Sequence, residues 1–205
     1  MNSALKALQR LRSGNLEFVD RKLPVLEHPL SFGNKEQAPF AVILGCSDSR
    51  VPVEIVFNQG FGDLFVIRVA GNIVAPSQIG SIEFAVEKFG TPLVVVLGHT
   101  NCGALSTTLD ELQRPGTPSR NLRSIVDRVR PAVQGLLCTE LKDNPELLLK
   151  AAVRTNVSIA ANFLRHGSEA LEQLVETGRL LVVGAEYSLE TGKVDFFDGV
   201  PSELA

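Results

Sequence analysis

The sequence of 205 residues contains no tryptophan, one tyrosine, three cysteines and three histidines. A small and odd number of cysteines does not favour a disulfide framework. No apolar run approaches the roughly 20 residues that a membrane-spanning helix needs. The N-terminus also lacks a charged segment followed by the apolar core of a secretory signal. We therefore expect no membrane partner, free thiols, and a reducing compartment, the cytoplasm.

Excess positive charge is absent as well. The formal net charge is −3, which argues against a nucleic-acid partner because such proteins need basic surfaces for the phosphates. Hydrophobic residues make up 44% of the chain, enough for a globular core. The length favours one domain covering residues 1–205.

The apolar pattern predicts an α/β fold. Short apolar runs read as buried strands, and runs with a helical period lie between them. Such a β-α-β-α-β order favours a central, mostly parallel sheet of four strands flanked by helices, with right-handed crossovers. A short stretch at 194–197 reads as an antiparallel edge strand. The predicted strands cover 40–45, 63–70, 92–97 and 179–186, and the predicted helices cover 53–57, 76–89, 101–112 and segments between 121 and 178.

The first 36 residues form a distinct arm in this interpretation. Leu5, Leu8 and Leu11 recur at a helical spacing and predict an amphipathic helix, followed by a loop rich in proline and glycine. Packing on the chain's own sheet is the simplest role for such a helix.

Three metal-ligating side chains follow two of the predicted strands. Cys46 comes directly after the run 40–45, and His99 and Cys102 come after the run 92–97. Neighbouring parallel strands end at the same edge of a sheet, so these residues should meet. Two thiolates and one imidazole suit one zinc ion, and three protein ligands leave a fourth position open, as in catalytic sites. Taken singly, each residue is an ordinary core residue; the combination is what predicts zinc.

Asp48 and Arg50 form a charged pair next to Cys46. Beside a catalytic zinc, Asp48 would accept a hydrogen bond from zinc-bound hydroxide and orient it. Arg50 would hold Asp48 by a bidentate pair and keep it off the metal. An ordinary surface salt bridge is the alternative interpretation.

Two motifs carry a family resemblance: C-S-D-S-R-V-P at residues 46–52 and G-H-T-N-C-G at residues 98–103. Together they resemble the two signatures of the β-class carbonic anhydrases, and the resemblance runs from about residue 37 to 102. It implies reversible hydration of carbon dioxide to bicarbonate and a proton by zinc-bound hydroxide. No convincing proton shuttle is apparent.

The resemblance also implies roles for substrate-binding residues and for a partner subunit. Gln37 matches a glutamine that reaches the pocket across a dimer interface, and the N-terminal arm would lie on that partner. A homodimer or a dimer of dimers is therefore expected. The apolar pocket positions could equally be core residues, and a phenylalanine stands where many members have tyrosine. The remaining substrate-binding positions implied are Phe65, Ala70, Phe84 and Gly103.

Some members resembling this sequence close the site by moving the aspartate onto zinc, with bicarbonate held by a tryptophan, an arginine and a tyrosine. Arg68 and Tyr187 stand at matching places, but Ile43 replaces the tryptophan and offers no N–H donor. We therefore expect an open site at neutral pH, with Asp48 paired with Arg50. Arg68 and Tyr187 are then framework residues.

Three other functions fit parts of the pattern. The same fold could hydrolyse carbon disulfide or carbonyl sulfide. A zinc-binding regulator without turnover is possible, although a structural zinc would need a fourth protein ligand. A thiol redox protein lacks the support of a C-x-x-C motif. The third cysteine, Cys138, has no ligand partner nearby and is expected in the core.

Overall fold

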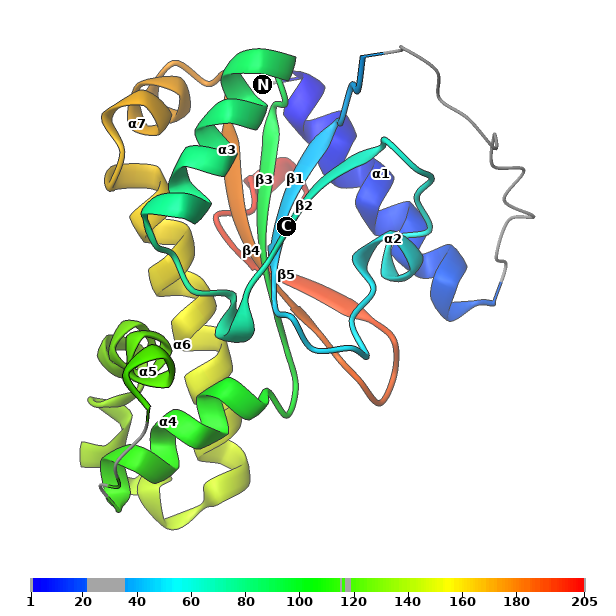
Figure 1. The fold of residues 1–205 in the computed structure, drawn as a ribbon. Coiled ribbons are helices and arrows are strands. Elements are labelled where there is room, and N and C mark those ends of the chain that lie inside the picture. The colour runs from blue at the N-terminus through cyan, green and yellow to red at the C-terminus, as the bar shows by residue number, and fades with distance from the viewer. Residues whose placement is uncertain (1, 22–35, 115, 117–118, 205) are drawn as a thin grey trace.

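The computed structural model describes residues 2–21, 36–114, 116 and 119–204 (Figure 1). Most of the expected loop of the N-terminal arm lies outside the described residues. The strands are β1 (Ala41–Gly45), β2 (Leu64–Arg68), β3 (Leu93–His99), β4 (Leu181–Tyr187) and β5 (Val194–Asp198). The α-helices are α1 (Asn2–Val19), α2 (Val53–Val56), α3 (Pro76–Phe89), α4 (Gly103–Gln113), α5 (Arg120–Val133), α6 (Pro145–His166) and α7 (Glu169–Glu176), with short 3-10 turns at Ala70–Asn72, Leu136–Cys138, Glu140–Asp143 and Ser202–Leu204.

The five strands form one sheet in the order β2-β1-β3-β4-β5. The first four are parallel, and β5 pairs antiparallel with β4. All residues of β1 and β3 are buried, because helices cover both faces of a parallel sheet. The predicted fold class is confirmed, including the antiparallel edge strand.

Helices cover the two faces of the sheet (Figure 1). One face carries α1 and α2, and the other carries α3, α6 and α7. Leu8 and Leu11 of α1 are fully buried in the same cluster as Ile43, Leu97 and Val183. The apolar side of α1 therefore covers the sheet of its own chain, the simpler of the two expectations.

A third core cluster lies beyond the carboxyl ends of the parallel strands, where α4, α5 and α6 gather in the lower part of Figure 1. It contains Cys46 and Cys102 together with Leu105, Val129 and Val153, which come from those three helices. The two cysteines are thus enclosed by apolar side chains rather than by water.

Helix α6 approaches the sheet at two glycines. A Cβ added to Gly98 would lie 2.6 Å from Cγ2 of Val157, and one added to Gly184 would lie 2.7 Å from Cγ1 of the same residue. The absence of side chains on β3 and β4 at this point lets α6 pack directly on the strands. This contact fixes the position of α6 relative to the carboxyl edge of the sheet.

Most elements begin or end within two residues of the sequence-based expectations, and two differences concern cysteine or histidine. Cys138 is exposed, not part of the core, because it lies on a short 3-10 turn between α5 and α6 that faces solvent. His99 is the last residue of β3, whereas the predicted strand ended at Leu97. Among the described residues, no helix combines the length and apolar composition needed to span a bilayer.

We predict that Gly184→Ala lowers the free energy of unfolding by about 1–3 kcal/mol, the usual cost of overpacking. Its new methyl group would meet Val157, so Val157→Ala should recover part of the loss in the double variant. Gly80→Ala is the matched control. Gly80 lies in α3, and a Cβ added there would meet no atom within 4 Å. Alanine at this position should raise the free energy of unfolding by about 0.5–1 kcal/mol. Denaturant unfolding measures all three; equal stability of wild type and Gly184→Ala would contradict the packing argument.

Candidate metal centre

The three predicted ligands meet at the carboxyl edge of the sheet. Cys46 directly follows β1, His99 ends β3, and Cys102 precedes the first residue of α4. Because Gly45 pairs with Leu97 in the parallel register, Cys46 after β1 and His99 at the end of β3 reach the same edge of the sheet. The ligand atoms of the three residues lie within 4.8 Å of one another, and all three residues are buried.

The spacing of the sulfur atoms fits a tetrahedral metal. The Sγ atoms of Cys46 and Cys102 are 3.9 Å apart. Two sulfurs bound to one tetrahedral zinc at about 2.3 Å would be separated by about 3.8 Å. The backbone therefore already holds the two sulfurs at the separation that one zinc ion requires.

His99 supplies the third ligand through Nε2. Its ring is fully buried, and Nδ1 donates a hydrogen bond to the carbonyl oxygen of Thr100 at 2.9 Å. That bond selects the tautomer in which Nε2 carries the lone pair. Within the part of the chain that the structure describes, Nε2 has no hydrogen-bond partner. A buried, unpartnered nitrogen facing two sulfurs is explained by a metal ion between them, so the residues fit zinc.

The hydrogen bond between the two sulfurs shifts their pKa values in opposite directions. The hydrogen bond with Cys102 lowers the pKa of Cys46 to about 4. The pKa of Cys102 is raised in turn, because its ionisation would break that hydrogen bond and place a second negative charge beside the first. Cys46 is thus ready as a thiolate ligand.

Asp48 and Arg50 form the expected bidentate pair. Nε of Arg50 donates to Oδ1 of Asp48 at 2.9 Å, and Nη2 donates to Oδ2 at 2.8 Å. The backbone N–H of Arg50 adds a third bond to Oδ1 at 3.0 Å. These hydrogen bonds hold the pKa of Asp48 well below its usual range, so the side chain is a carboxylate. Oδ2 lies 3.8 Å from Nε2 of His99, directly beside the ligand cluster.

Arg68 fixes the backbone that carries these groups. Its Nε donates to the carbonyl oxygen of Cys46 at 3.1 Å, and its Nη2 donates to the carbonyl oxygen of Asp48. Tyr187 is buried opposite His99 in the β3–β4 register, and burial raises its pKa. Ile43 is fully buried in the sheet. These contacts and this burial are compatible with the framework role expected for Arg68 and Tyr187, which stays a prediction.

The positions implied for substrate binding are divided between the two edges of the sheet: Ala70 and Gly103 lie at the carboxyl edge, whereas Gln37 and Phe65 lie toward the amino edge, where β1 and β2 begin. Phe65 on β2 contacts Phe84 on α3 with ring centroids 6.4 Å apart, and Phe84 is 52% exposed. Ala70 lies on the turn after β2, and Gly103 begins α4 next to Cys102. Gln37 is exposed on the stretch that leads into β1.

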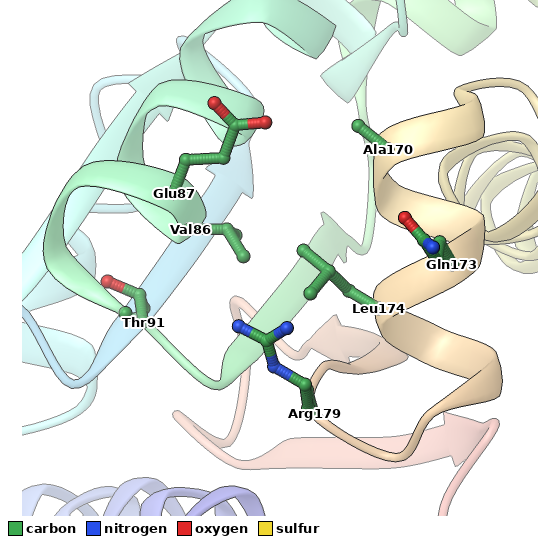
Figure 2. A pocket seen from close by; sticks show the side chains of 8 residues that line it. Val86, Glu87, Thr91, Ala170, Gln173, Leu174 and Arg179 are labelled. Carbon is green, nitrogen blue, oxygen red and sulfur yellow. The ribbon is translucent and has the colours of Figure 1, made fainter.

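Figure 2 shows a separate cavity of about 380 Å³ between α3 and α7. Thr91 and Arg179 on its wall precede β3 and β4, so it lies at the amino edge of the sheet. None of the metal-centre residues lines it, and it plays no part in the chemistry at the other edge.

Sequence reasoning missed one contact to the cluster. The backbone N–H of Gly71 donates to Sγ of Cys46 at 3.4 Å. In the sequence, the Gly71–Asn72 pair marks only the end of a strand. Almost every residue has a backbone N–H, so the sequence does not indicate which one will contact the sulfur. This contact can be identified only in the folded chain.

Comparison with known proteins agrees with the geometry. The family model described as carbonic anhydrase matches residues 41–194. A carbonic anhydrase from Mycolicibacterium smegmatis is 37% identical over 199 residues, which cover 95% of this chain and 93% of that protein.

Solved structures are similar as well. The β-carbonic anhydrase CcaA has a TM-score of 0.70 and 27% identity, covering 95% of this chain and 93% of that one. A structure from the report of two tetrameric β-carbonic anhydrases of Sordaria macrospora has a TM-score of 0.67 and 26% identity, covering 79% and 82%. With the family model spanning both motifs and a relative matched over nearly its whole length, the chain belongs to the β-carbonic anhydrase family of enzymes.

Proposed function

We propose that the protein catalyses the reversible hydration of carbon dioxide to bicarbonate and a proton, with one zinc ion held by Cys46, His99 and Cys102. The observation that carries this proposal is the bidentate Asp48–Arg50 pair beside a cluster with three ligands. A purely structural zinc would need a fourth protein ligand, and the described part of the chain offers three in this cluster. A regulator without turnover fits this arrangement less well.

The metal supplies Lewis acidity: a zinc ion, when bound, makes water nucleophilic at neutral pH. The thiolates of Cys46 and Cys102 would hold the ion and would also cancel most of its positive charge. As a metal ligand, the imidazole of His99 would be neutral and would add no further negative charge. The neighbouring polar groups therefore have to assist the reaction.

Asp48 provides that assistance as a hydrogen-bond acceptor. A carboxylate only accepts hydrogen bonds, so Oδ2 would accept one from the O–H of the attacking oxygen. This bond would orient the lone pair of the attacking oxygen toward the carbon of carbon dioxide. Arg50 occupies both carboxylate oxygens from the side and keeps the side chain from swinging onto the metal. Formation of the new C–O bond gives bicarbonate, and the released proton passes to solvent or buffer.

Carbon dioxide is apolar and needs an apolar pocket. Ala70 supplies such a surface next to the cluster, whereas Phe65 and Phe84 lie toward the amino half of β2, with about half of Phe84 exposed in the single chain, so these two rings would reach a cluster only across a subunit interface. Covering this aromatic face by a second subunit would exclude water from the substrate. Gln37 of the partner subunit would complete the pocket, and the tetrameric neighbours support such an assembly. We propose a homodimer or a dimer of dimers.

The thiolate ligands also bear on the compartment. Cys46 and Cys102 are free, with sulfurs close enough for oxidation to compete with metal binding. A reducing compartment such as the cytoplasm keeps them available for zinc, and we propose that the protein works there.

We predict about one zinc ion per chain in protein purified without chelators. Cys46→Ala should lose it, because two ligands do not hold zinc tightly. Cys138→Ala is the matched control, since that exposed cysteine lies outside the cluster and its loss should leave zinc unchanged. Elemental analysis measures all three. Full zinc content in Cys46→Ala would refute the assigned ligands.

We predict that Asp48→Asn and Arg50→Ala keep zinc but lower the rate of carbon dioxide hydration about 100-fold or more. Asparagine carries no charge to attract the O–H, and loss of Arg50 releases Asp48 toward the metal. Asp127→Asn is the control, because Asp127 forms an exposed pair with Arg130 on α5 through a single contact of 3.2 Å, away from the cluster. Stopped-flow measurements give the hydration rate of each variant. Near-normal turnover of either site variant would show that the Asp48–Arg50 pair is an ordinary salt bridge without a catalytic role.

We predict a dimer or larger assembly at assay concentrations. Phe84→Asp should shift it toward monomers and reduce activity, because a charge would be buried at the interface. Phe163→Asp serves as the control, since Phe163 is similarly exposed but lies on α6. Sedimentation velocity gives the masses, and a fully active wild-type monomer would exclude a shared pocket.

A further inference from the structure

The turn after β2 bends around the metal cluster. Gly71 and Asn72 both have left-handed backbone angles, with φ of 68° and 42°. The N–H of Val69 donates to the carbonyl oxygen of Gly45 at 3.1 Å, which ties the turn to the end of β1. The N–H of Gly71 then points at Sγ of Cys46, 3.4 Å away.

Only glycine fits at the centre of this turn. A Cβ on Gly71 would lie 3.2 Å from Cβ of Ala104 and 3.4 Å from Cγ2 of Val129, in addition to the cost of its positive φ. Glycine also moves easily between conformations. The turn therefore needs an outside contact to keep the N–H directed at the sulfur.

Asn156 provides this contact. It lies on α6 with 5% of its surface exposed, and its Nδ2 donates to the carbonyl oxygen of Gly71 at 2.9 Å. Gly71 is thus held on both sides, by its N–H at Cys46 and by its C=O at Asn156. The adjacent Val157 packs against the two sheet glycines, so the position of Asn156 is fixed by the core.

We propose that Asn156 is a positioning residue of the metal centre: it holds Gly71 so that its N–H donates to the Cys46 thiolate. The inference rests on the proposed zinc site. A hydrogen bond to a metal-bound thiolate draws negative charge away from the sulfur, which leaves the metal a stronger Lewis acid. In a centre with two thiolates this compensation matters. Without Asn156, a buried carbonyl group lacks its donor and the glycine turn relaxes away from the sulfur.

The first test examines the N–H···S bond in the unaltered protein. Wild type loaded with cadmium-113 and labelled with nitrogen-15 at glycine should show a scalar coupling between the metal and the Gly71 amide proton. Failure of the wild type to take up cadmium would refute the proposed metal centre. Stoichiometric uptake without this coupling would refute the present inference alone.

The second test uses Asn156→Asp, which keeps the size of the side chain and removes the amide donor. We expect the dissociation constant for zinc to rise about 10-fold or more, as for other residues that support metal ligands. In the cobalt-loaded protein, the thiolate-to-metal absorption band should move to longer wavelength, because the sulfur becomes richer in electrons. If this variant does not fold, the neutral and smaller Asn156→Ser takes its place with the same expectations.

Asn15→Asp is the matched control. Asn15 is equally buried, and its Nδ2 donates to the carbonyl oxygens of Val56 and Gly192, away from the metal cluster. It should lower stability while leaving the zinc dissociation constant and the cobalt band unchanged. A merely structural Asn156 would behave in the same way, and that result would overturn the proposal.

Discussion

The parallel pairing of β1 with β3 is the constraint on which the rest of the structure depends. It brings two chain segments, 53 residues apart between Cys46 and His99, to one edge of the sheet. The strands are buried on both faces and cannot slip without exposing their apolar side chains, so the separation of the ligands is fixed by the core. The cluster of three candidate metal ligands is a consequence of the sheet register.

Charge at the carboxyl edge is controlled by hydrogen bonds. The Cys46 thiolate receives a backbone donor from Gly71, and the Asp48 carboxylate is held by Arg50. Arg68 fixes the intervening carbonyl groups. Cys46 and Asp48 thus each have their own donor, and these hydrogen bonds lower the pKa of both groups.

Helix α6 links the stability of the core to the geometry of the site. Its Val157 rests on bare backbone at Gly98 and Gly184, and the preceding Asn156 reaches the turn beside Cys46. A shift of this helix would disturb the packing of Val157 and, at the same time, the hydrogen bond from Asn156 that holds Gly71 beside Cys46. Side chains in close-packed interiors transmit displacement rather than absorb it.

Strand runs, helical periods and the two motifs determine the fold class and the convergence of Cys46, His99 and Cys102, because apolar periodicity and strand order are local properties of a sequence. The bidentate pair of Asp48 with Arg50 follows from their spacing along the chain. The exposure of Cys138 and the contact of Asn156 with Gly71 were decided only by tertiary structure. Both depend on how segments distant in the sequence pack. Because every residue has a backbone C=O and all but proline have an N–H, the residue type does not reveal which group a backbone atom will hydrogen-bond.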